Sequence, residues 1–239
     1  MTLAVLGTAA AGYLLATRRT AWPPLRSLSW LLGLVVVAVA LTGPLAAAHG
    51  DLRAHMAGHL LVGMVAPVSL VLARPVTLAL RTLPRRAARA LAGILRSAPV
   101  RVLTDPFVAT ALNVGGLWLL YRTSLLGAML HDPGLHLLVS VHVLLTGWLA
   151  TAAVLAVEPM PHRRSAAVRA GALAAGMAAH DVLAKTLYAH PPAGVLDASA
   201  GARLMYDGGT VVHVLVAALL WRQWYRSRET VRAAALARA

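Results

Sequence analysis

The sequence predicts an all-α polytopic membrane protein built as a bundle of seven transmembrane helices. The first observation is the composition of the 239-residue chain, which is 59% hydrophobic and only 13% charged. Soluble domains are about a quarter charged. The second is a mean hydropathy of +0.71, with charged residues confined between long apolar runs, as is typical of membrane spans. We expect one membrane domain, residues 1–226, followed by a basic cytoplasmic tail, residues 227–239.

Seven apolar segments mark the predicted spans, and each approaches the roughly 20 residues that a helix needs to cross a bilayer. They are residues 2–17, 28–47, 54–73, 103–122, 134–157, 168–188 and 206–225. Asp105-Pro106 and Asp132-Pro133 open the fourth and fifth spans. An aspartate followed by proline is typical of a helix N-cap with proline at the first helical position. Capping is therefore enough to explain both aspartates.

The distribution of Lys and Arg predicts the orientation of the spans, because cytoplasmic loops carry an excess of basic residues. An outer N-terminus makes residues 18–27, 74–102, 158–168 and the tail cytoplasmic. With adjoining span ends included, 18 of the 22 basic residues then lie on that side. The exceptions are Arg53, Arg122, Lys185 and Arg203. This orientation, with a cytoplasmic C-terminus, explains the net charge of +14 without a nucleic-acid partner.

The longest cytoplasmic loop, residues 74–102, contains the stretch RRAARALAGILRS. Its mixture of basic and apolar residues is typical of a helix that lies in the membrane interface. We favour contact with anionic lipid on the cytoplasmic side. A docking surface for a cytoplasmic protein is the alternative.

The chain has no cysteine, which excludes disulfides, thiolate metal sites, covalent haem attachment and thiol nucleophiles. A metal site must therefore use His, Met, Asp or Glu. The stretch HMAGH has the histidine spacing of a zinc protease but lacks its glutamate, and Glu158 lies at the cytoplasmic end. G-x-S-x-G, P-loop and dinucleotide motifs are absent as well. The sequence therefore does not indicate an enzyme.

The histidines are distributed asymmetrically, since only one of the ten, His162, falls in a cytoplasmic loop. His49, His131 and His190 fall in outer loops. The others fall in the outer halves of spans, namely His55, His59, His136, His142, His180 and His213. At 1.5 Å per residue, four of these lie about 8–12 Å below the outer boundary, namely His59, His142, His180 and His213. Four helices thus present an imidazole at one level, which predicts a shared site inside the membrane.

The residues in and near this layer are candidate metal ligands. The main candidates are His55, His59, His142, His180 and His213, and the secondary ones are His136, His131, Met56 and Asp181. In HMAGH the two histidines are four residues apart, and Met177, His180 and Asp181 also share one helix face. Imidazole with thioether suits copper, including Cu(I), whereas imidazole with carboxylate also admits zinc.

Two other interpretations of the histidines stay open. A pair of histidines on bundle helices could hold haem b in an electron-transfer protein. The histidines could also act in a scaffold, where they bind helices together or sense pH. An absorbance spectrum separates the haem interpretation from the metal-ion one.

Several sequence blocks resemble the CtaG-like cytochrome c oxidase assembly factors. The most specific is HMAGHLLVGMVAPVSLVLARP, and similar blocks are YLLATRR, WPPLRSLSWLLGL, TGWL, VEPMP and LMYDGG. The resemblance covers residues 13 to 226 and implies a seven-helix plasma-membrane protein that helps place copper in a haem–copper oxidase. It implies copper ligands at His55, Met56, His59, His136 and His142. The expected partners are an oxidase subunit and an extracytoplasmic copper donor.

Overall fold

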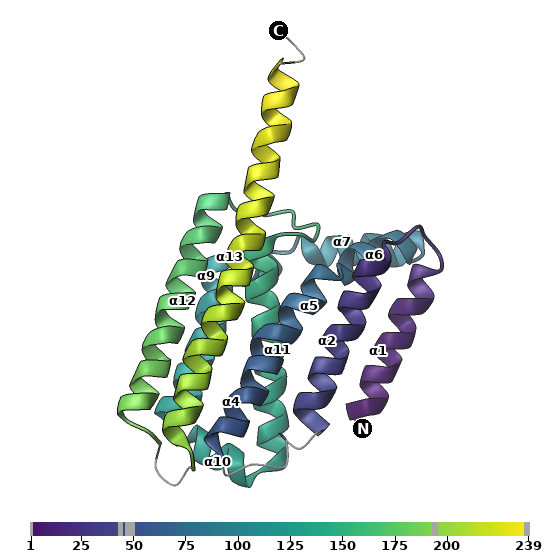
Figure 1. Ribbon diagram of the computed structural model, residues 1–239. Coiled ribbons are helices and arrows are strands. Elements are labelled where there is room, and N and C mark those ends of the chain that lie inside the picture. Colours follow the sequence, from purple (N-terminus) through teal and green to yellow (C-terminus); the bar gives the residue numbers. More distant parts are fainter. Residues whose placement is uncertain (1, 43–44, 46–50, 193–195, 237–239) are drawn as a thin grey trace.

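The computed structural model describes residues 2–42, 45, 51–192 and 196–236, and this part of the chain is almost entirely helical (Figure 1). The helices are α1 (Thr2–Thr17), α2 (Pro24–Thr42), α4 (Leu52–Leu60), the π-helix η1 (Leu61–Val65), α5 (Ala66–Leu72), α6 (Pro75–Thr82), α7 (Arg85–Leu95), α8 (Ala98–Leu103), α9 (Pro106–Arg122), α10 (Leu125–His131), α11 (Pro133–Leu155), α12 (Ala166–Ala189) and α13 (Ala198–Leu236). The all-α prediction is confirmed.

The long helices run side by side in one bundle, and the two ends of the chain lie at opposite ends of it (Figure 1). The segment α4–η1–α5 forms one continuous helical rod near the centre. It packs against α13 on one side and α11 on another, while α9 and α12 complete the ring. Helix α2 packs on the outside of α5, and α1 packs on α2. The ring of α4–η1–α5, α9, α11, α12 and α13 therefore encloses the interior of the bundle.

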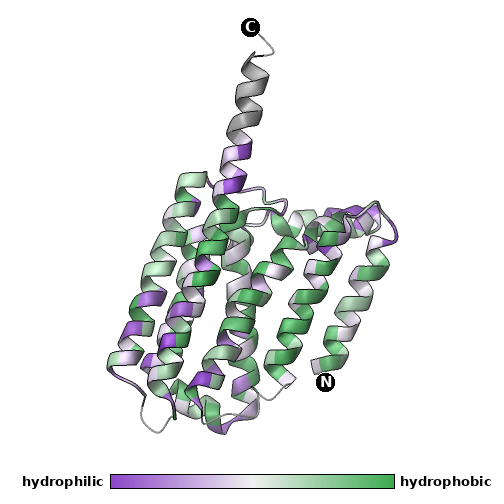
Figure 2. Ribbon diagram, in the orientation of Figure 1, coloured by the Kyte–Doolittle hydropathy of each residue, from purple (hydrophilic) through white to green (hydrophobic). Residues whose placement is uncertain are grey.

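Four helical segments of the described chain are long and apolar enough to cross a membrane. They are Pro24–Thr42, Leu52–Thr82, Pro133–Leu155 and Ala198–Ser227. Helix α1 is apolar but has only 16 residues, and α9 and α12 lie within the same bundle. In Figure 2 hydrophilic residues gather on α4, α12 and α13 toward the end opposite the C-terminus. By length and composition these four segments agree with the predicted membrane spans, and the count of seven stays a prediction.

The N-caps expected at two helices are confirmed. The Asp105 carboxylate accepts a hydrogen bond from Phe107 N at 3.1 Å. Asp132 accepts from Gly134 N at 2.7 Å and from Leu135 N at 3.1 Å. In both helices proline follows the cap, as predicted. Local sequence is therefore sufficient to begin α9 and α11, because the cap satisfies backbone donors at the helix start.

The loop expected at the membrane interface forms the short helices α6, α7 and α8. Helices α6 and α7 lie across the end of the bundle from which α13 projects (Figure 1). Helix α7 buries none of its residues, as expected for a helix that covers no protein core. The buried carboxylate of Glu158 attaches the α11–α12 loop to α6, where it accepts hydrogen bonds of 2.9 Å from Val76 N and Thr77 N. Glu158 thus lies away from the histidines, as predicted.

The last helix differs from its predicted bounds of 206–225. Helix α13 begins at Ala198 and continues to Leu236, through the two glycines at 208 and 209. The predicted bounds marked only the apolar stretch that could cross a bilayer, whereas the helix also includes more polar residues before and after that stretch. Most of the predicted tail, residues 227–236, is therefore a continuation of this helix.

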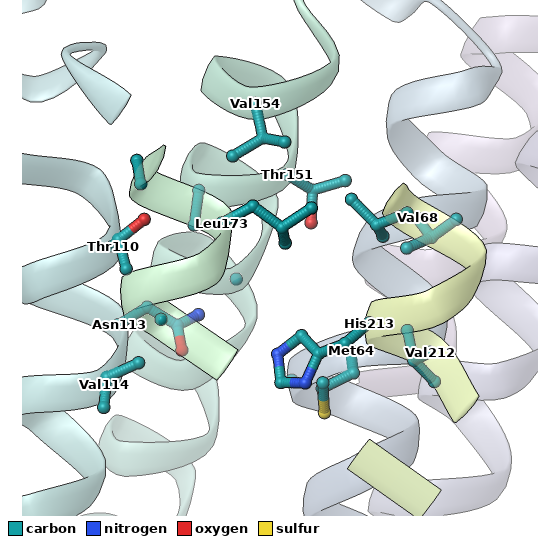
Figure 3. A pocket seen from close by; sticks show the side chains of 16 residues that line it. Met64, Val68, Thr110, Asn113, Val114, Thr151, Val154, Leu173, Val212 and His213 are labelled. Atoms are coloured by element: carbon teal, nitrogen blue, oxygen red, sulfur yellow. The ribbon is translucent and has the colours of Figure 1, made fainter. Parts of the chain in front are cut away.

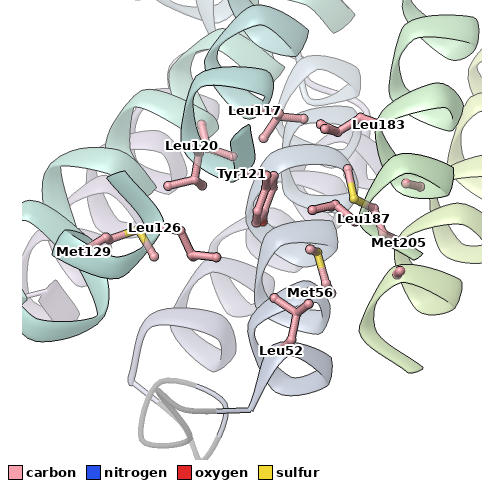
Figure 4. Packing of buried hydrophobic residues seen from close by; sticks show 13 residues of the cluster. Leu52, Met56, Leu117, Leu120, Tyr121, Leu126, Met129, Leu183, Leu187 and Met205 are labelled. Atoms are coloured by element: carbon pink, nitrogen blue, oxygen red, sulfur yellow. The ribbon is translucent and has the colours of Figure 1, made fainter. Parts of the chain in front are cut away.

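Two hydrophobic clusters fill the bundle at different levels. The first surrounds Leu52, Met56, Leu183 and Met205, near α10 (Figure 4). The second is formed by Val68, Val71, Ala152, Val154, Leu155, Val216 and Leu220. Along α4–α5, α12 and α13, the segments between the clusters carry His59, His180 and His213. The apolar core thus leaves a polar layer inside the bundle.

Candidate metal centre

Three candidate ligands from two neighbouring helices converge in this layer. His180 and Asp181 belong to α12 and His213 belongs to α13. One nitrogen of each imidazole and one carboxylate oxygen all lie within 4.8 Å of one another. The rings of His180 and His213 meet edge to face, with their centroids 5.2 Å apart. Bonds of about 2 Å to a metal would require these atoms to approach by roughly 1–2 Å, which is within the reach of side-chain rotation.

A third imidazole joins this group from α4. The ring of His59 stacks on that of His180, with centroids 6.3 Å apart and ring planes 18° apart. We refer to His59, His180, Asp181 and His213 as the inner cluster. His59 and His180 are buried, with exposed fractions of 8% and 2%.

The inner cluster contains polar atoms that no protein group satisfies. Within the described part of the chain, the buried side-chain atoms without a hydrogen-bond partner are Arg169 Nε and five atoms of the cluster. Those five are His59 Nε2, His180 Nδ1, His180 Nε2, Asp181 Oδ1 and His213 Nδ1. A buried polar atom left without a partner costs about 1–3 kcal/mol. Such a concentration of unsatisfied donors and acceptors is typical of a site built for a ligand.

Two glycines make room for the cluster. A Cβ atom on Gly209 of α13 would lie 3.0 Å from His180 Nδ1 and closer still to the ring carbon beside it. A Cβ atom on Gly63 would lie 3.3 Å from a ring carbon of His59 and 2.8 Å from a methyl of Val143. Because these contacts are tighter than van der Waals distance, only glycine lets the two imidazoles take up their observed positions.

A second group of polar side chains lies next to the inner cluster. His55 Nε2 is 3.0 Å from the Tyr121 hydroxyl oxygen, which links α4 to α9. His55, His59 and His136 line a cavity of about 50 Å³ together with Tyr121 and Met129. His59 thus belongs to both groups. The expected pairing of His55 with His59 on one side of α4 agrees with this cavity.

A cavity of about 80 Å³ lies on the other side of the inner cluster, at the centre of the helix ring (Figure 3). His213 lines it, together with the polar side chains of Thr110, Asn113 and Thr151. Met64 of η1 lines it too. The sequence did not indicate that Met64, Asn113 and Tyr121 line these cavities. No local sequence pattern shows which way a residue in a uniformly apolar helix points.

The remaining candidates lie elsewhere. His142 is exposed on α11, with its Nε2 against Gly116 of α9, so it does not join the inner cluster. His131 is exposed, with its Nδ1 2.7 Å from the Gly127 carbonyl oxygen. Met56 is fully buried in the first hydrophobic cluster (Figure 4). Met177 lines an apolar groove between α12 and α13, and His49 lies outside the described residues.

The donor set of the inner cluster fits a metal ion. Three imidazoles and a carboxylate are ligands for copper or zinc. Ligand atoms of His180, Asp181 and His213 already lie within 4.8 Å of one another. The unsatisfied atoms of the cluster have no hydrogen-bond partner that a metal would need to displace.

Residues 10–227 match the family described as the cytochrome c oxidase caa3 assembly factor. Uncharacterized proteins of Mycobacterium bovis and Mycobacterium tuberculosis are each 33% identical over 184 residues, which is 73% of this chain and 28% of each relative. An uncharacterized Mycobacterium leprae protein is 32% identical over 170 residues, or 66% of this chain and 25% of that protein. The chain thus spans about a quarter of the length of these relatives. No solved structure matches it significantly. Over most of its length, this chain belongs to the family of cytochrome c oxidase caa3 assembly factors.

Proposed function

We propose that this protein binds copper at the inner cluster and delivers it to a haem–copper oxidase during assembly of that enzyme. The observation that carries the proposal is the convergence of His180, Asp181 and His213, with His59 stacked beside them. Five buried polar atoms of these four residues have no hydrogen-bond partner. Copper is the cargo of the protein and is not consumed, so no catalytic residues are required. The family supports the oxidase as the acceptor.

The proposed topology is seven spans in the plasma membrane, with the N-terminus outside and the C-terminus in the cytoplasm. The opposite positions of the two chain ends support an odd number of crossings (Figure 1). The exposed arginine-rich helix α7 would lie on anionic cytoplasmic lipid. Arg85, Arg86 and Arg89 would then be at the same end as Arg163 and Arg164 in the α11–α12 loop. The inner cluster would lie in the outer half of the membrane.

The arrangement supports transfer by stepwise ligand exchange. An extracytoplasmic donor would present copper to His55 and His136, which line the cavity of about 50 Å³. His59 lines that cavity and also stacks on His180, so its imidazole connects the two groups. Copper would then pass to His180, Asp181 and His213 without crossing apolar protein. An oxidase subunit docked in the membrane would accept it from there.

Haem b is the alternative ligand, and the size of the cavities favours an ion. The cavities beside the buried histidines measure about 50 and 80 Å³, whereas sites for small organic ligands and cofactors usually measure roughly 300–1,000 Å³. An absorbance spectrum of the purified protein with a Soret band and sharp α and β bands would favour haem. A colourless preparation that takes up copper supports the proposal.

The direct test is copper retention by the full-length chain, purified in detergent, loaded with Cu(I) under anaerobic conditions and desalted. We expect the wild-type chain to retain copper and the His180→Ala/His213→Ala variant to lose it. His142→Ala is the matched control, because it removes an exposed imidazole outside the cluster. Loss of copper from the control, or full retention by the double variant, would overturn the assignment. In cells, the double variant should also leave oxidase activity low.

A further inference from the structure

The central rod of the bundle contains a π-turn directly after the second histidine of HMAGH. Segment η1 covers Leu61–Val65, and the Ala66 amide donates to the Leu61 carbonyl five residues earlier. One such turn contains one more residue than an α-helical turn. The side chains that follow it are therefore rotated about the helix axis by roughly 100° relative to an uninterrupted α-helix. Such π-turns inside α-helices are rare and are frequently found at functional sites.

The π-turn presents side chains to both cavities, since buried Val62 lines the cavity of about 50 Å³ and half-buried Met64 lines the one of about 80 Å³. Met64 lines the central cavity of about 80 Å³, where its side chain lies beside His213 and across from Asn113 in the view of Figure 3. Gly63 lines it as well, so the backbone at the π-turn is close to the cavity. The turn therefore brings a thioether to the same small cavity as an imidazole of the inner cluster.

Packing in an apolar cluster explains the buried methionines of the bundle but not Met64, which is half-buried. Met56, Met129 and Met205 belong to the first hydrophobic cluster, among leucines (Figure 4). Met64 belongs to neither of the two clusters on the ring helices. It instead faces a cavity whose mainly apolar lining includes the polar side chains of Thr110, Asn113 and Thr151.

The second donor at this cavity is His213, whose Nδ1 is buried without a hydrogen-bond partner. Thioether sulfur is a soft ligand that selects Cu(I), whereas carboxylate is a hard one. His213 is thus shared between two donor sets, one with the Asp181 carboxylate and one with the Met64 thioether.

We propose that Met64 and His213 form a second, deeper Cu(I) station, with the Asn113 amide beside it. Copper would move from the inner cluster to this station by ligand exchange on His213 and would remain Cu(I) throughout. The station rests on the proposed copper binding, and it adds a softer site on the side of the cluster away from the donor. His213 would be the ligand common to both sites, so copper could stay bound to it while its other ligands are exchanged.

X-ray absorption at the copper edge tests the station, because a chain without cysteine can offer copper sulfur only from methionine. The full-length protein would be loaded anaerobically with Cu(I). We expect a sulfur neighbour in wild type and in Met56→Leu, and its loss in Met64→Leu. Competition with a Cu(I) chelator should show an affinity at least about tenfold lower for Met64→Leu, as for other changes around metal sites. Leucine preserves the volume of the side chain, so the fold should be kept.

The possible outcomes separate the two proposals. Copper bound with a sulfur neighbour that disappears in Met64→Leu supports the station. Copper bound to wild type without sulfur, or with sulfur that persists in Met64→Leu, overturns the station and leaves the inner cluster in place. A wild-type chain that binds no copper overturns the proposed function and the station with it.

Discussion

The imidazole of His59 stacks on that of His180 at a centroid distance of 6.3 Å, although the two residues lie far apart in the sequence, on α4 and α12. This contact joins the cavity lined by His55 and His136 to the donors on α12 and α13. The proposed copper path passes through this contact. Changes that move either ring should therefore alter copper handling more than changes elsewhere in the bundle.

Gly209→Ala should disturb the site while changing no ligand. The added methyl would lie 3.0 Å from His180 Nδ1. Because this methyl is attached directly to the Cα atom of α13, it cannot rotate away, and the His180 ring must move instead. We expect copper retention to fall and stability to drop by about 1–3 kcal/mol. Gly58→Ala is the control, because nothing lies within 4 Å of a Cβ atom there. Equal copper retention by both variants would argue against a requirement for the observed His180 position.

Tyr121→Phe should slow copper uptake without changing the final amount bound. The variant removes the hydroxyl that lies 3.0 Å from His55 Nε2 but keeps the buried ring in the first hydrophobic cluster. His55 is expected to receive copper first, so a less well oriented imidazole should lower the initial rate. Rapid mixing with a Cu(I) probe complex measures that rate. An unchanged rate would exclude His55 from the first step.

Copper should stabilise the folded bundle, since a ligand that binds only the native state adds its binding free energy to that of folding. At a hundredfold excess over the dissociation constant this amounts to about 2.7 kcal/mol. For a chain of this size the melting temperature should rise by roughly 5–10 °C. The His180→Ala/His213→Ala variant should show no such rise. A similar rise in that variant would place copper elsewhere.

Glu158→Gln should destabilise the protein without affecting copper binding. The buried carboxylate accepts hydrogen bonds from Val76 N and Thr77 N, and an amide would turn a donor toward at least one of them. We expect a loss of about 1–3 kcal/mol, measured by thermal unfolding in detergent. Asp132→Asn is the comparison, because asparagine caps helices as well as aspartate does and should cost little. Lower copper content per folded chain in Glu158→Gln would contradict this separation.

Local chemistry in the sequence was sufficient for some features and insufficient for others. The caps at Asp105 and Asp132 were predictable because a cap depends on neighbouring residues alone. The level of the histidines followed from counting residues along spans. Their rotation did not, because lipid and protein core are both apolar and leave little amphipathic signal. His142 consequently lies outside the cluster that contains His180, although both were predicted at the same depth.

The π-turn was also beyond prediction. Nothing in the residues Leu61–Val65 distinguishes a π-helix from an α-helix, since both suit apolar residues. The turn forms in the context of close packing, where Gly147 of α11 lies directly against the Gly63 carbonyl. As a result the direction of Met64 depends on a tertiary contact.

The single carboxylate of the inner cluster has a consequence for charge balance. Metal ligands bind in their deprotonated forms. A set of three imidazole ligands and one carboxylate ligand therefore contributes one negative charge, which a monovalent ion would neutralise. A divalent ion would leave a net positive charge between the two apolar clusters, because Asp181 is the one carboxylate of the inner cluster. Uncompensated charge in such surroundings is costly. The bundle would therefore discriminate between ions by electroneutrality as well as by ligand type, admitting Cu(I) while disfavouring Zn²⁺ and Cu(II).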